Sequence, residues 1–226
     1  MPAPSREKAW DLLSEHTRGE GLRKHALAVE FAMRAYAVQL GGDPDLWGLA
    51  GLLHDFDYEA HPSREEHPYV GTEILRREGY PEEVVRAILA HAPYTGLERV
   101  TPMEKTLFAV DELCGFLVAC ALVQPGRTLG EVKVASVLKK LKDKHFARGV
   151  DRDHIVAGAA GLGVDLSKHI EFVLRTLQER ASPLGLGQES APSGTTGEPE
   201  VNPGETSLDS GGPHPIGSLE RKDEQK

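Results

Sequence analysis

The sequence has few of the features that mark membrane or exported proteins. No window approaches the roughly 18–20 uninterrupted apolar residues of a membrane span, and residues 1–8 are polar and lack the apolar segment of an export signal. We therefore expect no membrane partner and a cytoplasmic location. The two cysteines, Cys114 and Cys120, lie in one apolar stretch without forming a CxxC pair. This pattern excludes a disulfide framework and suits a reducing compartment.

Basic residues are outnumbered in this chain of 226 residues. Lys and Arg together number 26, against 35 Asp and Glu, which gives a formal charge of −9. This balance argues against nucleic acid held mainly through its backbone phosphates. It leaves a small anionic substrate open, because such a ligand needs only a local basic patch. Nothing in the sequence indicates an oligomeric state.

The composition changes abruptly near Ala181. From residue 182 to residue 226 the chain is dominated by Gly, Pro, Ser, Thr and Glu, and its few apolar residues, such as Leu184, are isolated. A segment of this kind cannot bury enough apolar surface to offset the entropy lost on ordering. We therefore predict a folded domain at residues 1–181 and a disordered, acidic, low-complexity tail at residues 182–226.

Before this point the apolar residues recur with a helical period almost throughout. Helix start signals are present at Ser5, at Asp43-Pro44 and at Thr101-Pro102. Two glycines, Gly48 and Gly51, lie in a nearly all-apolar segment and indicate close packing against a neighbouring helix. The pattern predicts an all-α bundle of about eight or nine helices. After a first helix capped by Ser5, the expected helices cover residues 20–40, 45–54, 67–78, 81–91, 102–122, 129–142, 152–161 and 166–180.

Several ionisable side chains lie on helix faces that should be buried. Asp111, for example, shares an apolar stripe with Leu107 and Cys114 in the middle of an expected helix. Taken singly, each such residue is more often a hydrogen-bonded core residue than a metal ligand. Together they come from five helical segments, and burying so many imidazoles and carboxylates without a cation would leave polar atoms unpaired. The residues concerned are His25, His54, Asp55, His67, His91 and Asp111.

These side chains indicate a metal centre. Imidazole and carboxylate ligands without thiolate suit Fe, Mn, Zn, Co or Ni rather than a structural zinc ion. The order of the residues also resembles the HD-domain superfamily of metal-dependent phosphohydrolases. Residues 51–55 (Gly-Leu-Leu-His-Asp) are similar to the family's His-Asp signature, and residues 110–112 (Val-Asp-Glu) are similar to its final Ala-Asp or Val-Asp helix.

The resemblance extends to a subgroup of the HDIG type that carries two additional histidines. Residues 67–71 (His-Pro-Tyr-Val-Gly) resemble its His-x-x-x-Gly element, and Ala90-His91 resembles its later histidine at a helix end. The match spans about residues 20–115. Residues 56–58 depart from it, because they read Phe-Asp-Tyr where the HDIG variant has Ile-Gly. We expect the tight turn of that glycine to be absent here.

The resemblance implies an HD-type bundle with a dinuclear metal centre. The implied ligands are His25, His54, Asp55 and Asp111 for the first ion, and His67, His91 and the bridging Asp55 for the second. Two ions are expected, Fe or Mn first, with Co, Ni, Zn or Mg as the other options. The implied activity is hydrolysis of a small phosphate ester, a nucleotide above all, by a metal-bound hydroxide.

A phosphate substrate also needs residues beyond the metal ligands. Asp57 follows the His-Asp doublet and is a candidate catalytic residue beside Asp55, as a proton relay; the alternative is that it caps a loop. Residues 139–152 form the only concentrated basic stretch, which predicts either a phosphate clamp or a solvated helix face. No role is assigned to His154 or His169. The candidate phosphate-binding residues are Arg23, Lys24, Lys105, Lys140 and Arg148.

Two other functions stay open at this point. Some dinuclear iron members of the superfamily are oxygenases that cleave C–C or C–P bonds, and they share the same six-ligand order. The chain could also be a non-catalytic, metal-stabilised module that binds a nucleotide or a partner. The intact His54-Asp55 doublet weighs against such a module, because degenerate HD modules usually lose it.

Overall fold

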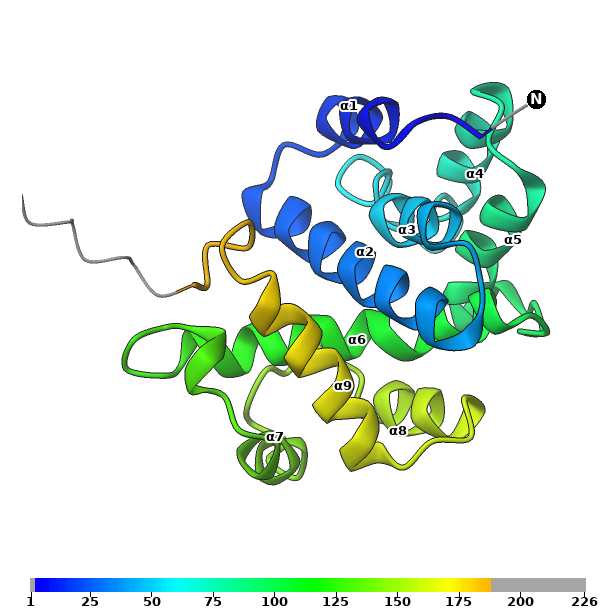
Figure 1. Ribbon diagram of the computed structural model, residues 1–226. Coiled ribbons are helices and arrows are strands. Elements are labelled where there is room, and N and C mark those ends of the chain that lie inside the picture. The colour runs from blue at the N-terminus through cyan, green and yellow to red at the C-terminus, as the bar shows by residue number, and fades with distance from the viewer. Residues whose placement is uncertain (1–2, 188–226) are drawn as a thin grey trace, which may run out of the picture. The chain divides into compact units, whose positions relative to one another are not determined.

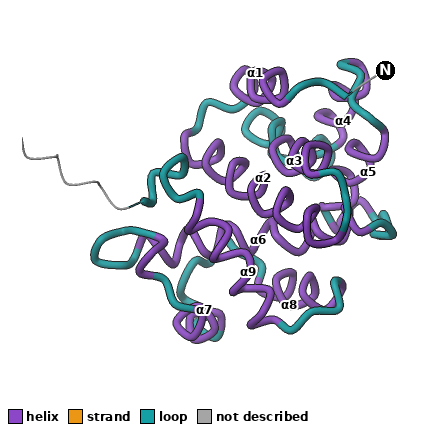
Figure 2. The backbone as a smooth tube through the Cα atoms, viewed as in Figure 1, coloured by secondary structure: helices purple, strands orange, loops and turns teal. Residues whose placement is uncertain are grey.

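The computed structural model describes residues 3–187, and this part of the chain is all-α. It contains nine α-helices and two short 3₁₀ helices, and no strand occurs among these residues (Figure 2). The predicted all-α bundle of eight or nine helices is confirmed. None of the described helices is both long enough and apolar enough to cross a membrane. The elements are α1 (Arg6–His16), α2 (Glu20–Leu40), α3 (Pro44–Leu53), α4 (Tyr69–Arg77), α5 (Glu82–His91), η1 (Pro93–Thr95), α6 (Pro102–Leu122), η2 (Leu129–Glu131), α7 (Val134–Leu141), α8 (Arg152–Gly161) and α9 (Leu166–Glu179).

The helices begin at the capping residues expected from the sequence. The side chain of Ser5 accepts a hydrogen bond from the first turn of α1, and that of Asp43 accepts two from the first turn of α3. At the start of α6, Thr101 and Glu104 form a reciprocal capping box. Each cap satisfies backbone N–H groups that have no partner inside the helix, and so determines where the helix begins.

Helices α2 and α6 run through the middle of the domain (Figure 1). α2 packs on α3 and α6, and α6 also packs on α5 and α8. The predicted close packing of α3 is confirmed, because a Cβ atom on Gly51 would lie 2.9 Å from the backbone of Glu30 in α2. A Cβ atom on Gly158 of α8 would likewise lie 2.5 Å from Cα of Ala109 in α6. These close approaches bring the ionisable residues of α2, α3 and α6 within reach of one another.

The expected helix at residues 129–142 is divided in the structure. A 3₁₀ turn, η2, is followed by Val132 and Lys133 in extended conformation, and only then does α7 begin. The N–H of Leu129 donates to the carbonyl of Leu186, and the carbonyl of Leu129 accepts from Gln178 in α9. Because these long-range bonds involve the backbone of Leu129, the segment follows its contacts with the C-terminal end of the domain rather than its helical propensity.

The C-terminal limit of the domain also differs from the expectation. Residues 182–187, which the composition placed in the tail, lie on the helical domain, with Leu184 and Leu186 buried. Two apolar side chains close together supply enough contact to hold a short segment, although the stretch that follows is polar. The rest of the predicted tail, residues 188–226, lies outside the residues that the structure describes.

Candidate metal centre

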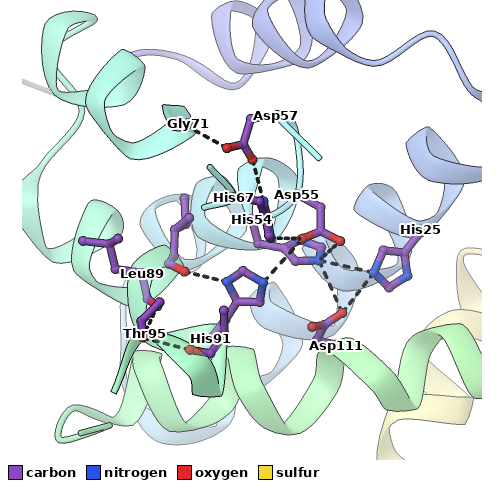
Figure 3. A network of polar contacts seen from close by, with 12 residues as sticks. His25, His54, Asp55, Asp57, His67, Gly71, Leu89, His91, Thr95 and Asp111 are labelled. Atoms are coloured by element: carbon purple, nitrogen blue, oxygen red, sulfur yellow. Dashed lines mark hydrogen bonds and ion pairs between the residues drawn. The ribbon is translucent and has the colours of Figure 1, made fainter. Parts of the chain in front are cut away.

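The structure brings together the six histidines and aspartates expected to hold metal (Figure 3). They form two groups of potential ligand atoms that share Asp55, and within each group these atoms all lie within 4.8 Å of one another. His25 and Asp111 project from α2 and α6, His54 and Asp55 follow the end of α3, His67 precedes α4, and His91 ends α5.

The first group consists of His25, His54, Asp55 and Asp111. The Nε2 atom of His25 lies 3.0 Å from Oδ1 of Asp111, and Nε2 of His54 lies 3.3 Å from the same oxygen. The two Nε2 atoms are 3.2 Å apart. Oδ2 of Asp55 completes the group, 3.3 Å from Nε2 of His54. All four side chains therefore direct a potential ligand atom to one small region.

The second group consists of Asp55, His67 and His91. Oδ1 of Asp55 lies 3.2 Å from Nε2 of His67 and 3.4 Å from Nε2 of His91. Asp55 thus faces the first group with one oxygen and the second group with the other. A carboxylate in this orientation can bridge two cations.

The ring orientation of three histidines is determined by bonds at their other nitrogen. Nδ1 of His54 lies 2.8 Å from the carbonyl of Gly51, and Nδ1 of His91 lies 2.5 Å from the carbonyl of Ile88. A carbonyl only accepts hydrogen bonds, so each Nδ1 carries the proton, and the lone pair of the neutral ring is on Nε2. Both carbonyls belong to helix ends, where backbone acceptors lack helical partners. The lone pairs therefore point into the cluster, as metal ligation requires.

The third histidine, His67, is oriented by Asp57. Oδ1 of Asp57 lies 2.8 Å from Nδ1 of His67, and its Oδ2 accepts from the N–H of Gly71 at 2.8 Å. A Cβ atom on Gly71 would lie only 2.6 Å from Cγ of Asp57. This contact explains the His-x-x-x-Gly spacing, because the glycine makes room for the carboxylate that orients the histidine. Asp57 is 1% exposed and both of its oxygens are engaged, so the geometry describes a positioning residue.

The ionisation of the cluster favours positive charge at its centre. Burial raises the pKa of the Asp55 carboxyl, but the charge of His54 and hydrogen bonds from the imidazoles hold it well below its usual range, and Asp111 is lowered in the same way. Burial disfavours a charged His54, yet Asp55 and Asp111 raise its pKa well above the usual value. Burial also disfavours a charged His67, but Asp55 and Asp57 raise its pKa to about 9. The charge that these groups favour is the charge that a metal ion supplies, so the residues fit such a group.

The cluster opens into a pocket with a volume of about 430 Å³. His25, Asp55 and Asp111 are each about one-fifth to one-quarter exposed, whereas His54 is fully buried. Burial and the nearby Asp111 raise the pKa of Glu112, on the pocket wall, to about 7. Beyond the cluster, the side chains that line the pocket include Tyr58, Arg64, Tyr94, Phe108, Glu112, Asp151 and His154.

The five predicted phosphate-binding cations are not among the residues that line this pocket. Arg23 donates to the carbonyls of Thr17 and Ser14, and so ties the end of α1 to α2. Lys24 pairs with Glu20 at 2.6 Å and lines a different cavity. Lys140 lies over the ring of Phe146. The other two are Lys105, which is partly buried on α6, and Arg148, which is exposed in the loop before α8.

Several pocket residues were missed by the sequence reasoning. Arg64 and Tyr58 lie in an irregular loop, where no periodicity indicates which way a side chain points. His154, given no role, lines the pocket because α8 packs closely on α6. No role is expected for His169 from the sequence, yet its side chain is buried in α9. Its position four residues before Val173 places it on the apolar face of this helix, which is a signal that the sequence carries.

Comparison with known proteins agrees with this geometry. The family model described as "HD domain" matches residues 22–114, a range that contains all six clustered residues. This part of the chain is an HD domain. The match agrees with the resemblance of this part of the sequence to the HD superfamily of metal-dependent phosphohydrolases.

Curated relatives of the domain are proteins named ribonuclease Y. The chain is 35% identical to that of Desulfotalea psychrophila over 151 residues, which are 65% of this chain and 27% of that protein. It is 32% identical to that of Rhodopirellula baltica over 108 residues, 47% of this chain and 19% of that protein. It is 38% identical to the Thermus thermophilus protein over 74 residues, which are 32% of this chain and 13% of that protein. The chain thus spans about a quarter or less of these relatives. No solved structure gives a significant match.

Proposed function

We propose that this protein is a metal-dependent phosphohydrolase with a dinuclear centre. The observation that carries the proposal is Asp55, whose two oxygens face two separate groups of ligand atoms. His25, His54 and Asp111 would hold one divalent ion together with Asp55, and His67 and His91 would hold the other. Fe and Mn suit these ligands best, and Co, Ni, Zn and Mg are the alternatives to test.

Two ions in these groups would supply Lewis acidity and a water of lowered pKa, which is the chemistry that phosphate hydrolysis at neutral pH requires. The chain's own residues perform the positioning. Asp55 faces both groups, the helix-end carbonyls orient His54 and His91, and Asp57 orients His67. The protein wall around the buried histidines keeps bulk water to the pocket side of the cluster.

We propose a nucleotide-type phosphate ester as the substrate class. The rings of Tyr58 and His154 line the pocket and are at least partly exposed, so they offer faces on which a base can stack. The relatives' name, ribonuclease, favours a second candidate within this class, the phosphodiester of RNA. The acidic balance of the chain favours the small nucleotide, because few cations are available to follow an RNA backbone.

The test is metal analysis of the purified full chain, followed by hydrolysis assays with Mn, Fe, Co, Ni and Mg. The panel contains 5′- and 3′-mononucleotides, cyclic nucleotides and short RNA. We expect close to two ions per chain and turnover that disappears in His54→Ala, while the exposed His145→Gln serves as the matched control. Turnover that survives His54→Ala would contradict the assignment to this site. Oxygen uptake without phosphate release, together with a mixed-valent iron EPR signal, would replace hydrolase with oxygenase.

A further inference from the structure

Arg64 is the one Lys or Arg side chain among the residues that line the metal-centre pocket in the described part of the chain. The other charged lining residues besides histidine are all acidic: Asp55, Asp111, Glu112 and Asp151. A phosphate ester entering this pocket meets negative charge on most sides. Arg64 is therefore placed where a permanent cation has most effect on an anionic ligand.

The guanidinium of Arg64 lies over an aromatic ring and, among the residues that the structure describes, has no carboxylate partner. Its Cζ atom lies 5.3 Å from the centroid of the Tyr94 ring, within the range of a cation–π contact. Among residues 3–187, no Asp or Glu oxygen forms an ion pair with Arg64, whereas Arg6, Arg34, Arg76 and Arg86 all form one. A cation–π contact uses none of the N–H donors, and within residues 3–187 the Arg64 guanidinium donates no hydrogen bond, so its N–H groups are left to bind a ligand.

The ring beneath Arg64 is itself held against the metal centre. The hydroxyl of Tyr94 donates to the carbonyl of His67 at 3.0 Å. Tyr94 lies in the short helix η1, and the hydroxyl of the next residue, Thr95, donates to the carbonyls of Leu89 and Ala92 at the end of α5. Tyr94 is thereby fixed to the backbone next to both histidines of the second group. The Tyr94 ring therefore positions Arg64 on the side of the cluster formed by His67 and His91.

We propose that Arg64, seated on Tyr94, is the phosphate-binding side chain of this pocket. It contacts the non-bridging oxygens of a phosphate next to the second group of ligands and orients the substrate for hydrolysis. This inference rests on the proposed function, and Arg64 takes the place of Lys140 and Arg148, which do not line the pocket. The recognised chemistry is a phosphate group with free oxygens, from a mononucleotide or from an RNA strand.

Three variants test the proposal: Arg64→Gln, Arg64→Lys and Arg77→Gln. Arg77 is a matched control, since it is also an exposed arginine, bonded only to a backbone carbonyl of its own helix. For the best substrate of the panel we expect Arg64→Gln to raise KM about tenfold or more with kcat changed much less, and Arg64→Lys to recover part of the loss, because a lysine keeps the charge but loses the planar fork. A KM in Arg64→Gln equal to that of the wild type and of Arg77→Gln overturns the proposal.

A second readout needs no turnover. Inorganic phosphate is titrated by calorimetry into the metal-loaded full chain, and metal content is measured in the same samples. We expect a Kd about tenfold weaker in Arg64→Gln at unchanged metal content. Equal phosphate affinity in Arg64→Gln and wild type overturns the proposal even if the protein is an active hydrolase. Wild-type protein that binds phosphate through Arg64 but hydrolyses nothing overturns the proposed function and leaves the phosphate site supported.

The two sources of the phosphate are separated by the choice of ligand. 5′-AMP, 3′-AMP and short RNA with a 5′-phosphate or a 5′-hydroxyl are compared in wild type and in Arg64→Gln. A loss of affinity confined to the mononucleotides and the 5′-phosphorylated RNA assigns Arg64 to a terminal phosphate. A loss that is equal for both RNAs assigns it to an internal phosphodiester. Both outcomes support phosphate binding, whereas no loss with any of the ligands excludes it.

Discussion

The two groups of the candidate metal centre are built in different ways. His25 and Asp111, in the first group, project from the interior of long helices, and each is about one-fifth exposed to the pocket. Nδ1 of His25 has no hydrogen-bond acceptor within residues 3–187. In the second group, His67 and His91 lie at an irregular segment and a helix end, are nearly buried, and have Nδ1 held by Asp57 and by a carbonyl.

The difference shows two ways of positioning a metal ligand. A long helix fixes the backbone of its residue, so the side chain needs little further support. A residue in a loop has no such restraint, and a second side chain must orient it. We therefore expect His67 to depend on a residue that never touches the ion, whereas His25 and Asp111 depend mainly on helix packing. Three predictions test this comparison, and a fourth concerns a buried histidine outside the two groups.

The largest effect is expected where the two halves meet. Replacing Asp55 with Ala removes one oxygen from each group, so both ions should be lost and hydrolysis should fall to the background rate. Metal content by mass spectrometry and turnover with the best substrate measure this. His25→Ala, which touches only the first group, should retain more metal than Asp55→Ala. Equal retention of both ions in Asp55→Ala would show that the carboxylate does not bridge.

The second prediction concerns the support of His67. In Asp57→Asn an amide N–H₂ faces either the N–H of Gly71 or that of His67, so one of the two hydrogen bonds is lost. We expect the affinity for one of the two ions to fall about 10–100-fold and the affinity for the other to stay close to normal. Isothermal titration of the metal-free chain measures both, with the exposed Asp11→Asn as control. An equal weakening of both ions would contradict the independence of the two halves.

The third prediction compares two glycine substitutions. A Cβ atom on Gly71 would meet Asp57 at 2.6 Å, whereas one on Gly21, in α2, would meet nothing within 4 Å. Gly71→Ala should lower the free energy of unfolding by about 1–3 kcal/mol through overpacking. Gly21→Ala should raise it by about 0.4–1 kcal/mol, because alanine leaves the unfolded chain fewer conformations than glycine does. Urea denaturation measures both, and a neutral Gly71→Ala would show that the Asp57 contact is loose.

The smallest effect is expected away from the metal centre, at His169. Its Nδ1 accepts from the hydroxyl of Tyr36, and its Nε2 donates to the carbonyl of Ala109. Burial lowers the pKa of His169 in the folded protein below its usual value near 6.5, so the unfolded chain binds the proton more readily. The free energy of unfolding should therefore decrease as the pH falls through about 6.5.

The His169→Gln variant provides the comparison for this last prediction. It should lose part of the pH dependence measured by urea denaturation between pH 5 and 8, because the titrating group is gone. The metal-free protein is used in both cases, so that ion release does not contribute. If the free energy of unfolding changes with pH equally in the wild type and in the variant over this range, the assignment to His169 is contradicted.

Much of the bundle and of the metal centre could be predicted because both follow helical periodicity. Asp111 was visible as a carboxylate on an apolar stripe, and His54 and His91 as histidines at helix ends. The lining of the pocket could not be predicted in this way. Arg64 and Tyr94 lie in segments without a period, and their positions depend on how the loops fold over α5.

Lys140, in the basic stretch, is the opposite case: the sequence indicates a phosphate-binding residue, but the side chain does not line the pocket. A high local density of charge in the sequence carries no information about distance in the fold, and Lys140 packs over Phe146 instead of reaching the pocket. The sequence indicates Asp57 as a candidate, but its role as a positioning residue follows only from the two hydrogen bonds that use both of its oxygens. The position of Leu186 depended in the same way on a tertiary contact, its bond with Leu129.

The most direct test of the shared carboxylate is anomalous diffraction from crystals of the full chain grown with manganese. Two anomalous peaks about 3.5–4 Å apart, on either side of Asp55, are the predicted result. A single peak bound to one group alone, or no peak within reach of Asp55, would contradict the dinuclear centre.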